Sequence, residues 1–343
     1  MPAVFTRATR RVAAIATVIT GALLLSACSS GGASTSAGSS DFGTVTIKHA
    51  LGTAVITEQP KRVVTLGMGS AETAIALGTV PVGIEEYPWG SDDTGYLPWI
   101  HEALEAEGEA LPPQFTGGAE LDIEAVLDLD PDLILAPWSG LTQDQYDILS
   151  DIAPTVAYEK LPWTITWQDQ MSVIGQALGK SDEATRLIDG ISDTFAEATA
   201  AHPEYRDVSF SYTYNTGPGT LGVFLADEQR VAMVRGLGLQ VDPVVKTLDE
   251  TEGTDSSLIG LENGDLLNGS DLIFTFYSDA ANRAEIEAQP LYQQIPAIAR
   301  GSVVAPEEQA FVTGSSIINP LTVPWTLERY VPLIDAAIAK LGK

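Results

Sequence analysis

Residues 166–202 read TWQDQMSVIGQALG (166–179) followed by KSDEATRLIDGISDTFAEATAAH (180–202), and this stretch divides the chain. Gly179 interrupts the first helical pattern, and Ser181 is the expected N-cap of a second helix because its hydroxyl can accept hydrogen bonds from first-turn amides. Apolar side chains then recur at spacings of three and four, which predicts one apolar helix face: Ala184, Leu187, Ile188, Ile191, Phe195 and Ala198. A helix over about residues 182–201 would span roughly 30 Å, the width of a small domain.

Short apolar strands alternate with helices on both sides of this stretch. Before it, we expect a hairpin over 44–57, strands at 63–66, 80–84, 132–136 and 155–158, and helices at 71–77, 122–129 and 142–150. After it, we expect strands at 208–214, 221–225, 271–276 and 302–305, and helices at 228–237, 262–267 and 324–341. This alternation predicts parallel sheets covered by helices on both faces. The expected domains are an N-terminal α/β lobe at 44–165, helices at 166–201 with the inter-lobe bridge at about 182–201, and a C-terminal α/β lobe at 202–343.

The charge balance excludes a nucleic-acid role. The 343 residues include 18 basic and 46 acidic side chains, a net charge of −28, and 45% are hydrophobic, which excludes general disorder. The first 27 residues hold three arginines and no acid, so the chain without them would carry −31. Such a surface repels nucleic acid and anionic lipid. It suits either a partner with basic patches or a simple adaptation for solubility or high salt.

The N-terminus predicts a lipoprotein. A basic start with Arg7, Arg10 and Arg11 precedes an apolar run over residues 12–25, which is too short to span a membrane. Leu25-Ser-Ala-Cys28 resembles a bacterial lipobox, in which cleavage precedes a cysteine that receives lipid. We therefore expect a signal peptide at 1–27, lipid on Cys28 and a flexible tether at 28–43, which is rich in Ser and Gly. The folded body would lie at the outer face of the cell membrane, and export by the general or the twin-arginine route stays open.

Sequence motifs for catalysis or metal binding are missing. The three histidines, His49, His101 and His202, are scattered, and there is no H-x-H, H-E-x-x-H, C-x-x-C or G-x-S-x-G motif. Gly67-Met-Gly69 follows a predicted strand but lacks the remaining residues of a dinucleotide or phosphate loop, which favours a tight strand–helix turn. We therefore predict no catalytic and no metal-binding residues. A lipid-anchored enzyme of nitrogenase-like or esterase type is disfavoured because no nucleophile–base pair or cluster cysteines are present.

Aromatic residues follow several of the predicted strands and predict a binding cleft. They are Trp89, Trp138, Trp163, Tyr214 and the pair Phe276-Tyr277. In open parallel sheets, ligands bind beyond the carboxyl ends of the strands, and aromatic rims suit a large, partly apolar ligand. Packing of each tryptophan against its own lobe is an even alternative, and Trp325 is expected in the core. Aromatic residues from both halves favour a shared cleft over a purely structural lipoprotein.

Five further stretches, in this order, carry a family resemblance: PKRVV (60–64), LGTVPVG (77–83), DIEAVLDLDPDLIL (122–135), LGKSDEA (178–184) and LYQQIPA (291–297). With the lipobox, they resemble a siderophore-type solute-binding lipoprotein of a bacterial ABC importer. The resemblance implies two Rossmann-like α/β lobes joined by a single long α-helix, with a ligand cleft between the lobes. It also implies a monomer without catalysis or an intrinsic cofactor, which carries a ferric-siderophore complex to the permease and ATPase subunits. A heme- or cobalamin-binding receptor of the same superfamily is the alternative.

The resemblance also implies that one acidic residue on each lobe meets arginines of the permease. The matching positions are Glu124, in the helix before the PDLIL strand, and Glu262, in the segment LENGDLL. Asn268-Gly-Ser270 makes the turn after Glu262 one residue longer than the family pattern. Exposed carboxylates on two lobes can fix orientation through bidentate arginine pairs, although both residues also fit as ordinary solvated acids.

The scarcity of arginine bears on the ligand. Anionic ferric chelates call for several cleft arginines, and here only Arg230, and with weaker support Arg235 or Arg283, could face a cleft. Arg230 is equally compatible with an exposed helix surface. Aromatic residues without a basic cluster favour a near-neutral or cationic chelate, such as a ferric hydroxamate or a mixed lipophilic siderophore.

Overall fold

The structure, a computed structural model, describes residues 42–251 and 254–342. The predicted signal peptide, Cys28 and nearly all of the predicted tether lie outside the described residues. Phe42 belongs to the folded unit, because its side chain packs against a buried apolar cluster and its ring approaches Gly179. Within the described part of the chain, no helix is both long and apolar enough to cross a membrane.

The first half builds a five-stranded parallel sheet in the order β5-β4-β3-β6-β7. Its strands are β3 (Val63–Thr65), β4 (Gly83–Glu85), β5 (Gln114–Phe115), β6 (Leu133–Leu135) and β7 (Thr155–Val156). The central strands β3 and β6 are buried along their whole length, as expected for apolar strands covered on both faces. Ahead of them lies the predicted hairpin, in which β1 (Val45–His49) and β2 (Gly52–Ile56) pair antiparallel.

Helices flank this sheet, and α1, α3 and α4 lie at or near the predicted positions. The helices are α1 (Ser70–Ala76), η1 (Pro88–Gly90), α2 (Pro98–Glu107), η2 (Gly118–Glu120), α3 (Ile123–Asp128) and α4 (Gln143–Ile152). Side chains cap two of the predicted helices, since Asp122 accepts the amide of Ala125 in α3 and Thr142 accepts that of Gln145 in α4. The short strand β5 and helix α2 had not been predicted.

The second half builds a mixed sheet, which corrects the expectation of a parallel one. Its order is β11-β9-β8-β12-β13, with β10 beside β8. The strands are β8 (Ser209–Tyr214), β9 (Gly222–Phe224), β10 (Gln240–Val241), β11 (Ser256–Leu258), β12 (Leu272–Phe274) and β13 (Val303–Val304). Strands β8, β10, β12 and β13 are parallel, but β9 pairs antiparallel with both β8 and β11. The short connection over 215–221 contains no helix and turns the chain straight back, which only an antiparallel pair allows.

The remaining helices cover this second sheet. They are η3 (Pro203–Asp207), α7 (Gln229–Gly236), η4 (Pro243–Thr247), η5 (Leu261–Gly269), α8 (Ala280–Glu287), η6 (Tyr292–Gln294), α9 (Pro296–Arg300), α10 (Gln309–Gly314), α11 (Thr322–Ile338) and η7 (Ala339–Leu341). The α/β fold class predicted from the sequence is confirmed.

Two helices, α5 (Trp167–Ala177) and α6 (Ser181–Ala201), occupy the stretch that divides the sequence. The predicted N-cap is wrong by one residue: Lys180 is the N-cap and Ser181 is the first helical residue. The reason lies in the end of α5, where Gly179 adopts a left-handed φ of 65° and the Lys180 amide bonds to the Gly175 carbonyl. This closing turn uses both residues, so α6 begins directly after it.

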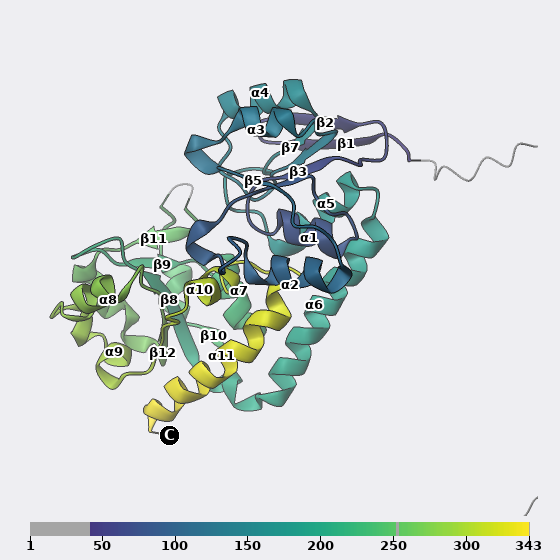
Figure 1. Cartoon of the computed structure of the whole chain (residues 1–343). Helices are drawn as coiled ribbons and strands as arrows, with labels where there is room; N and C mark the ends of the chain where they lie inside the picture. Colours follow the sequence, from purple (N-terminus) through teal and green to yellow (C-terminus); the bar gives the residue numbers. More distant parts are fainter. Residues whose placement is uncertain (1–41, 252–253, 343) are drawn as a thin grey trace, which may run out of the picture. The chain divides into compact units, whose positions relative to one another are not determined.

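The α5–α6 pair connects the cores under the two sheets. Ile174, Leu178 and Ala184 pack in the cluster that contains Val63 and Leu133 of the first sheet. Farther along α6, Ile191 and Phe195 join Phe210 and Phe274 in the core of the second sheet. Figure 1 shows α6 running from α5 past α11 to the connection that enters β8. The long helix predicted between the two groups of strands is therefore present, while the domain boundaries remain a prediction.

Candidate ligand-binding cleft

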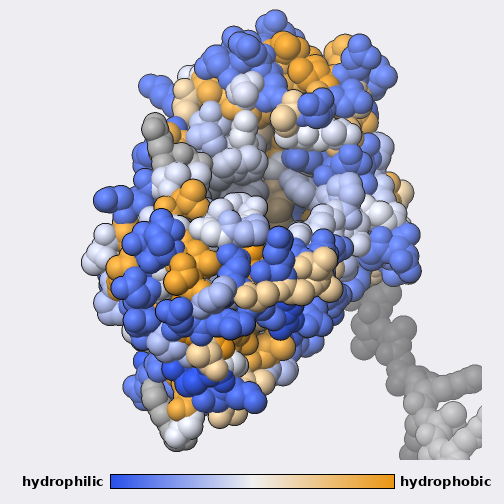
Figure 2. Space-filling model, turned by 90° about the vertical axis from the view of Figure 1, so that its left-hand side faces the viewer, coloured by the Kyte–Doolittle hydropathy of each residue, from blue (hydrophilic) through white to orange (hydrophobic). Residues whose placement is uncertain are grey.

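A cavity of about 440 Å³ lies between residues of the first and second halves of the fold. Its walls come from the loops after β3, β4 and β5 on one side and from α7, the end of β12 and α10 on the other. The lining residues are Met68, Glu85, Glu86, Tyr87, Pro88, Trp89, Gly90, Thr116, Gly117, Gly118, Arg230, Phe276, Val312, Thr313 and Ser316. Figure 2 shows one face of the molecule, with a hollow bordered by many hydrophilic residues. The cavity lies where the strands end, as the sequence predicted for a cleft.

The turn after β3 is a tightly packed strand–helix turn and not a phosphate loop. Gly67 has a φ of 76°, and a Cβ there would collide with the backbone carbonyl of Trp138. The Gly67 amide donates to Oε2 of Glu85 at 2.7 Å, and the Gly69 amide donates to Oε2 of Glu72 at 2.9 Å. The amides that could hold a phosphate are therefore already bound to carboxylates, as the interpretation of a tight strand–helix turn requires.

Trp89 stands at the mouth of the cavity on η1. Its side chain is 40% exposed. The adjacent Gly90 is buried and packs so closely on Thr313 of α10 that any larger residue would collide with it. This contact joins a loop of the first half to a helix of the second, and it fixes the base from which Trp89 projects.

Arg230 faces the same cavity from the start of α7. Its guanidinium lies 4.6 Å from the centre of the Phe224 ring and 5.9 Å from that of Phe276, within the range of cation–π attraction. It also forms an ion pair with the buried Glu228. Its Nε is buried without a hydrogen-bond partner. The ring contacts and the ion pair thus hold the guanidinium in place at the wall of the cavity.

The charges around the cavity are mostly acidic. Arg230 is the one basic residue among the described residues that line it, whereas Glu85 and Glu86 contribute carboxylates. Burial raises the pKa of Glu85, although the hydrogen bond from the Gly67 amide opposes the shift. Burial also raises the pKa of Glu228, and the nearby Arg230 opposes it. An anionic ligand would meet one cation, which is already paired with Glu228, and the two acids Glu85 and Glu86.

Other predicted aromatic residues lie outside the lining of this cavity. Trp138 and Trp163 pack edge to face with ring centres 4.7 Å apart, and Trp163 is 38% exposed with a φ of 66°. Tyr214 is half-buried, packs against Phe224 and bonds through its hydroxyl to Ser256 at 2.9 Å. The structure therefore brings together Trp89, Phe276 and Arg230 but not Trp138, Trp163 or Tyr214.

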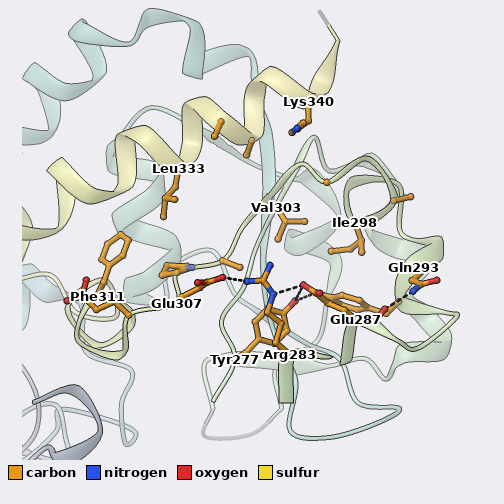
Figure 3. Close-up of a pocket in the computed structure, with 18 of the residues that line it drawn as sticks. Tyr277, Arg283, Glu287, Gln293, Ile298, Val303, Glu307, Phe311, Leu333 and Lys340 are labelled. Atoms are coloured by element: carbon orange, nitrogen blue, oxygen red, sulfur yellow. Dashed lines mark hydrogen bonds and ion pairs between the residues drawn. The ribbon is translucent and has the colours of Figure 1, made fainter. Parts of the chain in front are cut away.

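Tyr277 lines a different and larger groove of about 1020 Å³ on the second half, between α8, β13 and α11. Figure 3 shows Tyr277, Arg283 and Glu287 together, across the groove from Leu333 of α11. Arg283 is bound to Glu287 at 2.8 Å and Glu307 at 2.6 Å. Arg235 is also outside the cleft, since it is half-exposed and pairs with Asp227.

Several lining residues had not been predicted. Glu85 is the last residue of β4 and Thr116 directly follows β5, so their strand-end positions were the available signal, and β5 itself had been missed. Val312 and Thr313 belong to α10, whose sequence QAFVTG combines β-branched residues with glycine and gives a weak helical signal. The part of the second wall that α10 forms was therefore not predictable from the sequence pattern, whereas Arg230 and Phe276 of the same wall were predicted.

Both predicted docking acids are exposed. Glu124 lies in the first turn of α3 and Glu262 in the first turn of η5. Neither forms an ion pair with a described basic side chain. Each element leads directly into a strand, α3 into β6 and η5 into β12. That strand pairs with the strand of its sheet that comes first along the sequence: β6 pairs with β3, and β12 pairs with β8.

Comparison with known proteins shows which family has a matching sequence model. The sequence model of the family described as periplasmic binding protein matches residues 63–310. The probable siderophore-binding lipoprotein YfiY of Bacillus subtilis is 33% identical over 168 residues, which cover 48% of each chain. The Fe(3+) dicitrate-binding periplasmic protein FecB of Escherichia coli is 24% identical over 76% of this chain and 81% of its own.

Solved structures extend the similarity over most of the fold. The crystal structure of Streptococcus pneumoniae PiaA in complex with ferrichrome superimposes with a TM-score of 0.79 and 29% identity, covering 86% of this chain and 99% of that one. The matched region spans about half the length of the first curated relatives.

Proposed function

The chain belongs to the periplasmic binding protein family, whose similar members are binding proteins and not enzymes, and from that premise we propose a specific transport role. The protein is the solute-binding component of an ABC importer. It captures a ferric-siderophore complex in the cleft and delivers it to the membrane permease. No cofactor of its own is needed, because the iron is part of the transported ligand.

The cavity between the two halves carries this proposal. It holds an exposed indole, Trp89, and a stacked guanidinium, Arg230, on opposite walls. Its volume of about 440 Å³ lies within the range of small-molecule sites. A compact chelate with apolar and polar surface matches such walls better than a small anion does.

The sign of the charge selects among chelates. Glu85 and Glu86 outnumber Arg230 in the lining, and Glu228 already offsets the guanidinium. A strongly anionic complex would face like charges in a partly desolvated site. We therefore propose a neutral or cationic ligand, with ferric hydroxamates as the leading class.

The partners follow from the same role. Glu124 and Glu262 are proposed to meet arginines of the permease, which works with an ATPase subunit. Lipid on Cys28 would hold the protein, as a monomer, at the outer face of the cell membrane.

Titration of the mature, lipid-free chain with ligands of opposite charge tests the proposal. Quenching of tryptophan fluorescence is followed with cationic ferrioxamine B and with strongly anionic ferric enterobactin. Trp89→Phe locates the signal in the cleft. We expect tight binding of ferrioxamine B and weak binding of ferric enterobactin. Tight binding of ferric enterobactin alone refutes the proposed charge preference, and tight binding of heme or cobalamin alone refutes the siderophore assignment.

A matched pair of arginine variants tests the site itself. Arg230→Lys keeps the charge but loses the planar guanidinium that packs on Phe224 and lines the cavity, so ferrioxamine B binding should weaken roughly ten-fold. Arg235→Lys, on the same helix but outside the cavity, is the control and should bind like the wild type. Equal affinities in both variants would remove Arg230 from the site.

A further inference from the structure

Three potential metal ligands meet where the long helix ends. His202 is the C-cap of α6, Glu204 lies in η3, and Asp335 lies in α11. One ligand atom from each of these side chains lies within 4.8 Å of the other two. Nδ1 of His202 is 3.2 Å from Oε1 of Glu204. We propose that His202, Glu204 and Asp335 form a binding site for a divalent cation of the Zn²⁺ type that ties the end of α6 to α11.

The spacing of the ligand atoms suits this kind of ion. Zn²⁺ binds imidazole nitrogen and carboxylate oxygen at about 2.0–2.2 Å, so two ligands of a tetrahedral site lie about 3.4 Å apart. The His202–Glu204 distance is close to that value. Glu204 and Asp335 are both exposed, which leaves their carboxylates free to close on an ion and leaves room for water as a fourth ligand.

A buried tyrosine orients two of the three ligands. Tyr205 is fully buried, and its ring stacks on His202 with centres 4.7 Å apart and planes 19° apart. Its hydroxyl donates to Oδ1 of Asp335 at 2.7 Å. Such support from behind the ligands is typical of metal sites, where it fixes their orientation.

The charge of the cluster also favours a cation. Two carboxylates and an imidazole meet there, and the ion pairs of the described residues give neither Glu204 nor Asp335 a lysine or arginine partner. A bound divalent ion would neutralise both acids, whereas His202 alone can balance only one. The three ligands come from three elements, so binding would stabilise the attachment of α6 to the second half of the fold.

Calorimetric titration with ZnCl₂ alone tests this site, using the mature chain without a histidine tag and without siderophore. We expect one equivalent of Zn²⁺ to bind and to raise the unfolding temperature. Glu204→Gln is an exposed, conservative change that leaves folding intact, and together with Asp335→Asn it should weaken binding at least about ten-fold. His202→Ala should abolish it.

Another histidine pair provides the matched control. His101 and Asp92 lie 3.0 Å apart, and His101 is about as exposed as His202, but no third ligand joins the pair among the described residues. His101→Ala should therefore bind Zn²⁺ like the wild type. The proposal is overturned if the wild type does not bind Zn²⁺, if Glu204→Gln and Asp335→Asn bind it unchanged, or if Ca²⁺ binds equally well and independently of His202. Siderophore binding is measured separately, so failure here leaves the proposed function untouched.

Discussion

Asp255 is the residue through which pH should act on the region beside the cleft. It lies ahead of β11, and its backbone carbonyl accepts the amide of Leu225. Burial, together with the charges of Glu228, Glu250 and Asp227, raises its pKa to about 7 from an ordinary 3.8. The nearby Arg230 opposes that shift only in part. Between about pH 4 and pH 7, the folded chain therefore keeps a proton on Asp255 that an unfolded chain has already released.

The sign of the resulting stability change follows from proton linkage. Below about pH 4 both states are protonated at this group, and it contributes nothing. As pH rises from about 4 to 7, only the unfolded chain releases the proton, so stability is lost across that window. Asp255→Asn cannot ionise, and Asn tolerates the left-handed φ of 47° found here. The variant should therefore be more stable than the wild type near pH 8 and equally stable near pH 4.

Urea unfolding at the two pH values measures this difference. Asp249→Asn, a nearby exposed change, should shift stability little and equally at both. A stability gain for Asp255→Asn that is the same at both pH values would show that its ionisation has no part in the effect.

Single residues of the cleft could be predicted only where an unusual residue type occurs at a position that the predicted fold places near the cleft. Trp89 and Arg230 could be selected because a tryptophan in a loop and a rare arginine stand out in an acidic chain. Tyr277 follows β12 closely, yet its side chain lines the groove beside Arg283. The neighbouring Phe276 lines the cleft instead, and because both residues lie beyond the end of β12 at Phe274, strand alternation could not assign their directions.

At the scale of elements, the boundary between α5 and α6 depends on one glycine. Gly179 has a φ of 65°, and a Cβ there would lie 2.7 Å from the ring of Phe42. At Gly190, in the middle of α6, a Cβ would have no heavy atom within 4 Å apart from its chain neighbours and the backbone of its own helix. The two glycines therefore make opposite contributions, although the sequence alone does not distinguish them.

Alanine substitution at the two positions should change stability in opposite directions. Gly179→Ala should destabilise by about 1–2 kcal/mol, because a left-handed φ and a close ring both oppose a Cβ. Gly190→Ala should stabilise by up to about 1 kcal/mol, because alanine loses less entropy in a helix interior. Urea unfolding of the two variants measures both changes. If Gly179→Ala were neutral, the left-handed turn could not be what fixes the start of α6.

Helices and strands were predicted well where periodicity and capping residues determine them. They were predicted poorly where pairing with another strand determines them. The hairpin, β3, β6, α3, α4 and the α5–α6 pair follow from period and capping residues, and their bounds agree within about two residues. The direction of β9 depends on its connection to β8, and the two-residue strands β5 and β10 exist only through their neighbours. Neither property leaves a periodic signal in the sequence.

At the scale of the whole molecule, the two halves present matching acids. Glu124 precedes β6 and Glu262 precedes β12. Each of these strands pairs with the strand of its sheet that comes first along the sequence, β3 or β8. The sequence resemblance selected both residues, and topology now gives them equivalent positions in two sheets of different pairing. That equivalence is what a partner with two similar binding surfaces would require.

Charge reversal at both acids tests whether they dock the protein on its permease. Glu124→Arg with Glu262→Arg should abolish uptake of radiolabelled ferric siderophore by cells, because two cations would face the permease arginines. Ferrioxamine B affinity should be unchanged, since neither residue lines the cleft. The matched control reverses Asp128 and Asp265, which are exposed acids on the same two elements and carry the same change in charge. Equal loss of uptake in the control would assign the effect to overall charge, and loss of siderophore binding in the test variant would contradict a docking role for these two acids.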